Sequence, residues 1–196
     1  MDAQTKISSR RELTKAQNRE TILTAARQVF AEMGFAAVTV RDIIRATPLA
    51  SGTFYNYFKS KEEVYLALRD DVALAVRPRL RAARLGAATA EGFLFDSFCA
   101  FFQFVAENRG EQPAEAARFR MDSPEVVAGF AELREDIDSA VTQGLLPVMD
   151  TGFLTAALTG VAFELAEQVK GGAEPESVSR FATALFLGGM GAVKTA

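Results

Sequence analysis

The chain has 196 residues, of which 49% are hydrophobic, which is enough for one domain or two small ones with a sizeable core. It contains no histidine and a single cysteine, Cys99. This composition excludes histidine-based acid–base catalysis, a histidine-ligated zinc, a cysteine metal cluster and an intrachain disulfide. No nucleophile–base constellation appears, so we expect no enzyme, no metal and no cofactor.

The net charge of −3 is unevenly distributed along the chain. Residues 1–61 carry ten Lys and Arg against five Asp and Glu, whereas residues 62–196 carry twelve against twenty. A basic head on an acidic body is typical of a protein that offers one end to DNA. The N-terminus has no apolar signal-peptide core, and the longest uncharged stretches, 151–163 and 181–193, are shorter than the roughly 20 residues that span a bilayer. We expect a cytoplasmic protein with no membrane partner.

The first 18 residues form a mainly polar stretch that includes Lys6, Arg10, Arg11 and Lys15. We interpret residues 1–14 as a flexible arm, which either reaches into a DNA groove or stays disordered. A first helix is predicted over about 15–33, because apolar residues recur there at the spacing of an amphipathic helix. These residues are Ile22, Ala25, Ala26, Val29, Phe30 and Met33. Gly34 stands where a glycine ends a helix.

A second, short helix is predicted to begin after Thr39. Thr39 and Asp42 have the spacing of a capping box, in which side chain and backbone satisfy each other's hydrogen bonds. The helix must end early, because Pro48 cannot donate a backbone hydrogen bond and pushes Thr47 out of the α region.

Another short helix is predicted over about 50–58, and its two sides differ. Phe54 and Phe58 fall together, with Ala50 and Ser51 beside them, so this side is predicted to face the core. The opposite side carries the small or hydroxyl-bearing residues Gly52, Thr53 and Asn56, flanked by Tyr55 and Tyr57. Such a face admits a phosphate backbone closely and donates to it, and Asn56 can pair with a base edge. The alternative is that both tyrosines only border the packing of a small bundle.

These segments together resemble the DNA-binding domain of the TetR family of bacterial transcriptional regulators. The resemblance covers residues 20–66, about a quarter of the chain, and it is specific because order, spacing and residue type agree. The matching residues are Ile22, Ala25, Ala26, Phe30, Gly34, Thr39, Val40, Ile43, Gly52, Thr53, Tyr55, Tyr57, Phe58, Lys61, Glu62 and Glu63.

The resemblance implies an all-α fold of about nine helices. A three-helix helix-turn-helix head is expected over 15–62 and a ligand-binding and dimerisation body over 63–196. The residues expected to bind DNA are Thr39, Arg41, Ala50, Ser51, Gly52, Thr53, Tyr55, Asn56, Tyr57 and Lys61. Among them, Tyr55, Tyr57 and Lys61 are expected at phosphates, and Thr53 and Asn56 nearest the base edges.

Two residues depart from the family pattern in this region. Pro48 stands where many relatives carry Gly in the tight turn, and Ala50 stands where many carry a Ser that caps the recognition helix. Loss of a side-chain cap costs about 1 kcal/mol of helix stability, which docking of Phe54 and Phe58 can offset. Ala50 can instead meet a thymine methyl group. Both departures concern the operator preference rather than DNA binding itself.

The body is predicted to begin with a helix from Lys61, announced by the capping pair Ser60 and Glu63 and ended or kinked by Pro78. This helix is predicted to extend to about Val76. The arginines that follow are interpreted as a solvated linker, and they are Arg77, Arg79, Arg81 and Arg84.

A run of aromatic residues follows the small residues of 86–92. Its members are Phe93, Phe95, Phe98, Phe101, Phe102 and Phe104. Because apolar residues occur on nearly every side, this helix is predicted to be surrounded by protein. The rings either form an ordinary aromatic core or line a cavity for an apolar or aromatic ligand. Under the second reading, Phe98, Phe102 and Phe119 are the candidate cavity walls.

Four further helices are predicted at about 113–120, 123–143, 151–169 and 176–193. The last two are joined by Gly171 and Gly172 and have almost no polar side, so burial against a two-fold mate is expected. The expected interface residues are Leu158, Val161, Leu165, Phe181, Leu185 and Gly188.

Taken together, the sequence predicts a dimeric, ligand-responsive transcriptional regulator, with repression as its mode of action. Its expected partners are a palindromic double-stranded operator, a small apolar or aromatic effector and a second copy of the chain. The alternative from another class is an all-α small-molecule carrier or scaffold that does not bind DNA.

Overall fold

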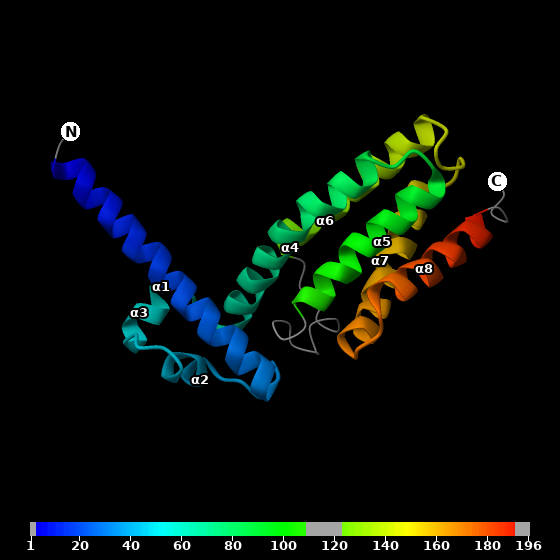
Figure 1. The fold of residues 1–196 in the computed structure, drawn as a ribbon. Coiled ribbons are helices and arrows are strands. Elements are labelled where there is room, and N and C mark those ends of the chain that lie inside the picture. Colours follow the sequence, from blue (N-terminus) through cyan, green and yellow to red (C-terminus); the bar gives the residue numbers. More distant parts are fainter. Residues whose placement is uncertain (1–2, 109–122, 191–196) are drawn as a thin grey trace. The chain divides into compact units, whose positions relative to one another are not determined.

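The computed structural model describes residues 3–108 and 123–190, and within these ranges it contains eight α-helices and no strand (Figure 1). The chain forms two compact units. Unit 1 comprises the described residues up to Leu68, and unit 2 comprises those from Arg69 onward. The predicted all-α class is therefore confirmed. The ninth predicted helix, at 113–120, lies outside the described residues.

Unit 1 is built by α1 (Ala3–Met33), α2 (Val40–Arg45), α3 (Ser51–Tyr55) and the first turns of α4 (Lys61–Leu85). These helices enclose one apolar core, formed by Ile22, Leu23, Ala26, Val29, Phe30, Phe35, Val38, Ile43, Phe54, Phe58, Val64, Tyr65, Ala67 and Leu68. The rings of Phe30, Phe35 and Tyr65 lie 4.9–6.0 Å apart at its centre. The predicted apolar stripe of α1 supplies one wall of this core.

The ends of α1 and the exposure of the start of α3 can be compared with their predictions. Gly34 ends α1 as predicted, with φ of 76° and its N–H donating to Phe30 O. The helix begins at Ala3 rather than near residue 15, so most of the predicted arm is helical. The prediction that Ala50 and Ser51 face the core is wrong, because both are exposed. With α3 only five residues long, the chain at Ala50 is still extended, and helical-wheel positions do not apply there.

Of the two alternatives predicted at Pro78, an end or a kink of the helix, the end is wrong, because α4 continues to Leu85. A proline inside a helix removes one backbone hydrogen bond, to the carbonyl four residues earlier. Here both Pro78 and Leu74 are exposed, so water can replace that bond. Arg77 before the proline and Arg84 after it bind acidic residues of α6, which holds α4 in place across the proline.

Unit 2 contains the rest of α4, α5 (Ala90–Glu107), α6 (Pro124–Thr142), α7 (Thr151–Lys170) and α8 (Pro175–Met190). Its core comprises Phe93, Leu94, Phe98, Phe102, Val105, Ile137, Ala140, Leu146, Leu154, Leu158, Ala166, Val169 and Ala182. Helix α5 packs mainly on α8 and also on α7, as its apolar residues on several sides predict (Figure 1). Ser123 and Asp150 cap α6 and α7 by accepting backbone N–H groups of Val126 and Phe153.

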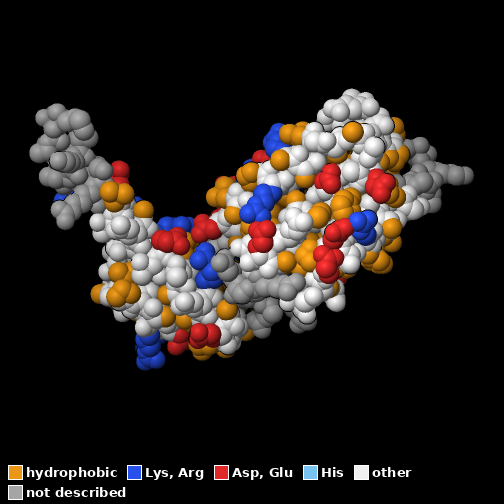
Figure 2. Space-filling view, viewed as in Figure 1, with side chains coloured by type: hydrophobic (Ala, Val, Ile, Leu, Met, Phe, Trp, Pro, Cys, Tyr) orange, Lys and Arg blue, Asp and Glu red, His pale blue; other side chains and the backbone are white. Residues whose placement is uncertain are grey.

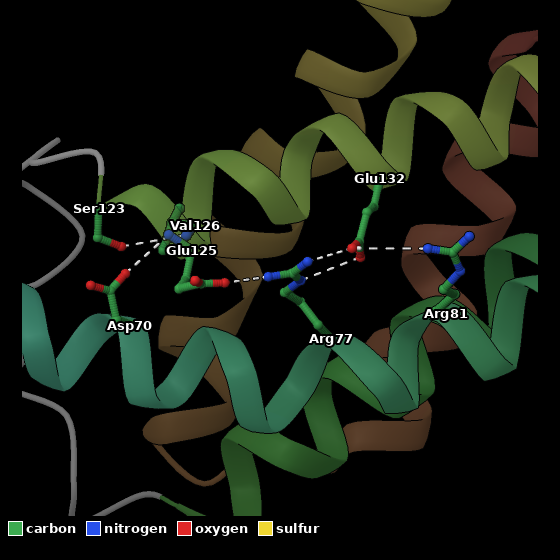
Figure 3. A network of polar contacts seen from close by, with 7 residues as sticks. All are labelled: Asp70, Arg77, Arg81, Ser123, Glu125, Val126 and Glu132. Carbon is green, nitrogen blue, oxygen red and sulfur yellow. Dashed lines mark hydrogen bonds and ion pairs between the residues drawn. The ribbon is translucent and has the colours of Figure 1, made fainter.

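A row of ion pairs joins α4 to α6 in unit 2 (Figure 3). The guanidinium of Arg77 points between Glu125 and Glu132 and donates to both, and this guanidinium holds the pKa of Glu132 below its ordinary value. Two turns later Arg84 Nε donates to Asp136 Oδ2 at 2.7 Å, with only 5% and 6% of the two side chains exposed. The interpretation of these arginines as a solvated linker is therefore wrong for Arg77 and Arg84.

The surface of unit 2 is mixed in character. Figure 2 shows Lys and Arg side chains close to Asp and Glu side chains on the face in view, with hydrophobic side chains exposed between them. Among the described residues, no helix is both long enough and apolar enough to cross a membrane.

Candidate nucleic-acid interface

The loop between α1 and α2 is held by a lysine from α4. Lys61 Nζ donates to the carbonyl oxygens of Phe35 and Val38, both at 2.8 Å, and to that of Ala36 at 3.3 Å. The same ammonium lies 4.7 Å from the centre of the Phe35 ring, within the range of a cation–π interaction. Lys61 therefore fixes the path by which the chain enters α2.

Helix α2 begins with the predicted capping pair. Thr39 N donates to Asp42 Oδ2 at 2.9 Å, and Thr39 Oγ1 donates to the same oxygen at 2.5 Å. These two hydrogen bonds stabilise the ionised carboxylate and hold the pKa of Asp42 below its ordinary value. Ile43, one residue later, is fully buried, so the cap and the core together set the direction of this helix.

The turn between α2 and α3 is organised by Thr47 rather than by a glycine. Thr47 Oγ1 donates to Ile44 O at 2.9 Å and accepts from Leu49 N at 3.2 Å. Leu49 packs against the core of unit 1, and Pro48 is exposed. Thr47 and Leu49 thus build the tight turn in which Pro48 departs from the family pattern.

Helix α3 begins at Ala50 without a side-chain cap. The backbone of Ala50 has the extended geometry of an N-cap, with φ of −67° and ψ of 149°, and its carbonyl accepts from Thr53 N at 2.8 Å. Phe54 is 1% exposed and packs its ring 6.1 Å from that of Phe58, as predicted. Burial of these two rings anchors the short helix in place of the missing cap.

The outward side of α3 is open. Gly52 and Asn56 are exposed, and a Cβ atom added at Gly52 would meet no atom of the described chain within 4 Å. Tyr55 is 57% exposed, and its ring meets that of Phe54 edge to face. Thr53 is half-buried on the same helix. A surface with little bulk, hydroxyl groups and one amide is suited to close approach by a DNA backbone and to base-edge contacts.

The end of α3 is tied to α1 through two side chains that the sequence did not single out. Asn18 Nδ2 donates to the hydroxyl of Tyr57 at 3.3 Å, and the guanidinium of Arg19 lies 5.8 Å from the centre of the Phe58 ring. Asn18 lies one turn before Ile22, which is the first buried residue among the described side chains of α1. This spacing was the only sign in the sequence that Asn18 borders the core. Through these contacts α1 supports the segment that follows the recognition helix.

The structure brings the predicted DNA-binding residues together in unit 1, with one difference in role. Most of them are exposed, and these are Thr39, Arg41, Ala50, Ser51, Gly52, Tyr55 and Asn56. Thr53, Tyr57 and Lys61 are half-buried. The three hydrogen bonds of Lys61 to loop carbonyls show a structural role that the sequence did not suggest, and its phosphate contact stays a prediction.

The candidate effector residues lie in the core of unit 2. The rings of Phe98 and Phe102 are buried and stacked, with centres 5.9 Å apart and planes 7° from parallel. Phe186 of α8 stacks on Phe98 at the same distance, whereas Phe119 lies outside the described residues. These contacts place two of the three residues in one aromatic cluster, and their ligand-binding role stays a prediction.

The candidate interface residues divide into two sets. Phe181, Leu185 and Gly188 are exposed on α8, with 61% and 51% of the first two residues exposed. Leu158 is instead buried in the core of unit 2, and Val161 and Leu165 pack against that core. Of the six predicted interface residues, all of them described, only the three on α8 are exposed.

A short helix held outward on a three-helix core, after a capped helix and a tight turn, defines a helix-turn-helix DNA-binding domain. A helical body follows it. Residues 22–68 match the family model described as "Bacterial regulatory proteins, tetR family". Over these residues the chain is similar to a family of bacterial regulatory proteins.

Solved structures of such regulators share the fold along most of the chain. The fatty acid degradation regulator FadR from Bacillus halodurans is 23% identical, with 88% of this chain and 95% of that chain covered and a TM-score of 0.72. FadR from Bacillus subtilis, solved with stearoyl-CoA, is 20% identical over 87% and 98% of the two chains, with a TM-score of 0.72. The ketosteroid regulator KstR2 of Mycobacterium tuberculosis is 22% identical over 87% and 93%, with a TM-score of 0.61.

Proposed function

We propose that this regulator is a homodimeric repressor that binds a palindromic operator and is released from it by an apolar or aromatic effector. The observation that carries the proposal is the open side of α3, where Gly52, Thr53 and Asn56 stand on a helix anchored by the buried ring of Phe54. A rigidly held face of this composition has a clear use in a DNA groove and little use in a carrier.

In the proposed complex α3 lies in the major groove. Thr53 and Asn56 contact base edges, and the hydroxyl of Tyr55 donates to a phosphate. Arg41 of α2, exposed two residues after the N-cap Thr39, reaches a neighbouring phosphate. A helix of five residues reads few base pairs, so two copies on adjacent half-sites, about 34 Å apart, are needed for selectivity.

The exposed apolar surface of α7 and α8 supports the dimer. Phe181, Leu185 and Gly188 follow one another at helical spacing on α8, and Phe153 and Gly160 are exposed on α7. A Cβ added at Gly160 or Gly188 would meet no described atom within 4 Å, so both positions allow a close approach of another helix. A self-complementary apolar patch is what a two-fold interface requires.

The aromatic core of unit 2 supports an effector with a large apolar part. Phe98, Phe102 and Phe186 stack in series where α5 packs on α8. FadR of Bacillus subtilis, which has the same fold, was solved with stearoyl-CoA, a ligand with a long apolar chain. Release from DNA requires the effector to bind more tightly to the arrangement of the dimer that does not fit the operator. As a repressor of bacterial genes, the protein would act in the cytoplasm.

The first experiment is a gel-shift assay with DNA from the promoter region of the protein's own gene. The wild type should shift this DNA selectively, and Asn56→Ala should relax preference at one base position per half-site, by about 1–3 kcal/mol. If neither the wild type nor the variant binds this DNA selectively, the result favours the alternative, a helical carrier that does not bind DNA.

The dimer and the effector have separate tests. Leu185→Glu places a carboxylate in the proposed interface and should give monomers with weak operator binding, as seen by analytical ultracentrifugation. An unchanged dimer would place the interface elsewhere. Native mass spectrometry of the purified protein should reveal a co-purifying apolar ligand, and stearoyl-CoA is the first compound to titrate into the operator complex.

A further inference from the structure

Helix α1 is much longer than the core that it serves. Its 31 residues extend over about 46 Å at 1.5 Å per residue, and among its described side chains, from Arg11 onward, the first buried one is Ile22. All described side chains from Arg11 to Gln17 are exposed. In Figure 1 the first turns of α1 extend beyond α2 and α3 with no helix of unit 1 beside them.

A polar helix without a packed face has no tertiary source of stability, because helices in proteins are stabilised chiefly by burial of an apolar side. The charge of this segment shows what could bind to it. Up to residue 19 the acidic residues are only Asp2 and Glu12. The basic residues are Lys6, Arg10, Arg11, Lys15 and Arg19. The excess of positive charge favours an anionic partner.

The basic side chains are arranged on a face that continues from the DNA-reading region. Arg11, Lys15 and Asn18 are spaced i, i+4 and i+7 and therefore share one side of α1. Asn18 is the residue that donates to the hydroxyl of Tyr57, just after α3. Within the described part of the chain, neither Arg11 nor Lys15 forms an ion pair with a carboxylate.

We infer that Arg11 and Lys15 bind backbone phosphates of DNA just outside the base pairs that α3 reads, so that α1 lengthens the operator contact. The inference rests on the proposed function, since it needs α3 in a groove. Asn18 and Tyr57 then join the two contacts into one surface, with base reading at α3 and phosphate binding along α1. Arg can hold a phosphate through two parallel hydrogen bonds and Lys as a point charge.

The test compares two duplexes that share one operator, identified by selecting bound fragments from genomic DNA with the wild-type protein. The short duplex contains only the base pairs whose substitution changes wild-type binding, and the long duplex adds flanking DNA of unrelated sequence on both sides. Binding is measured by fluorescence anisotropy over a range of salt concentrations, with the wild type and with the double variant Arg11→Ala, Lys15→Ala.

The wild type should bind the long duplex more tightly than the short one. The double variant should lose about tenfold in affinity on the long duplex, and its salt slope should fall by about 1.8 per bound chain, since each phosphate contact contributes about 0.9. On the short duplex the variant and the wild type should bind alike. Equal binding of the two proteins on both duplexes would overturn the inference.

Two control variants separate the effect from folding and from general charge. Exchange of the two cations, by Arg11→Lys with Lys15→Arg, should retain nearly all of the affinity for flanking DNA. Arg134→Ala removes an exposed arginine from α6 of unit 2 and should change neither duplex. Alanine favours helix, so circular dichroism should show α1 unchanged in the double variant.

The outcomes distinguish this inference from the proposed function. A wild type that selects no DNA sequence overturns both. A wild type that binds its operator selectively, with a double variant that still prefers the long duplex to the same extent, overturns only the role of α1. Loss of affinity on both duplexes equally would place Arg11 and Lys15 at the half-site itself and would also contradict the flanking contact.

Discussion

Each of the two units of this protein is stabilised by its own polar contacts, and these contacts differ in range along the sequence. In unit 1 the capping bonds join residues three or four apart, such as Thr39 with Asp42 and Lys59 with Glu63. In unit 2 the ion pairs of Arg77 and Arg84 join residues 48 to 55 apart. Short-range contacts set the boundaries of the small DNA-reading helices, whereas long-range ones set how the long helices pack. Unit 1 has its own long-range exceptions, in the bonds of Lys61 to the loop carbonyls and of Asn18 to Tyr57.

The largest loss of stability is expected when the buried ion pair of unit 2 is broken. Arg84→Ala leaves the Asp136 carboxylate buried without its partner, and it should lower the free energy of unfolding by about 3–5 kcal/mol. Chemical denaturation followed by circular dichroism measures the change. Arg79→Ala is the matched control, because its ion pair with Glu107 is about half exposed and is worth less than about 1 kcal/mol.

A double variant sharpens this result. Arg84→Met together with Asp136→Leu replaces both charges with apolar side chains and should recover most of the lost stability. If the double variant is as unstable as Arg84→Ala, then the packing of the arginine side chain, rather than an unpaired charge, accounts for the loss.

The second expected effect concerns the long-range contact of unit 1. Lys61→Met keeps the apolar stem but removes the ammonium from the carbonyls of Phe35, Ala36 and Val38, and it should cost about 1–3 kcal/mol. Thermal unfolding measures the loss. Lys59→Ala, an exposed lysine on the same segment, should stay within about 0.5 kcal/mol of the wild type. Equal stability of both variants would show that the loop does not depend on Lys61.

The third expected effect is a gain of stability when α3 is given the side-chain cap that it lacks. Ala50 already has N-cap geometry and is exposed, so Ala50→Ser can supply the missing side-chain acceptor without strain. Unit 1 should become more stable by about 1 kcal/mol. Ala50→Val, which offers no side-chain acceptor and is as poor an N-cap residue as alanine, is the control in a denaturation series. No difference between serine and valine would show that burial of Phe54 alone anchors α3.

The smallest expected effect is a shift in titration. The two bonds from Thr39 hold the pKa of Asp42 below its ordinary value, and Thr39→Ala, which removes the hydroxyl, should raise that pKa toward the ordinary value. Because the folded-state pKa is lowered, the cap stabilises the head above the ordinary pKa of aspartate, and this contribution is lost as the pH falls through the folded value. Carboxyl NMR during an acid titration measures both proteins. An identical pKa in the variant would mean that the backbone N–H of Thr39 alone sustains the shift.

Structural features that depend only on residues close together along the chain could be predicted from the sequence. The capping pair at Thr39, the glycine stop at Gly34 and the buried rings of Phe54 and Phe58 were all predicted and are confirmed. Such features need only a few consecutive residues, because a cap, a turn or an amphipathic stripe is complete within one or two helical turns. The all-α class follows from the same local patterns.

Contacts between side chains that are far apart along the chain could be found only in the folded structure. In that structure α4 continues beyond Pro78, and Arg77 and Arg84 form ion pairs with acidic residues of α6. Lys61 donates to three loop carbonyls, and Asn18 donates to Tyr57. No local pattern specifies these partners, because residues far apart in sequence become neighbours only when whole helices pack together. An exposed proline can then lie within a helix, since packing on either side offsets the one hydrogen bond that is lost.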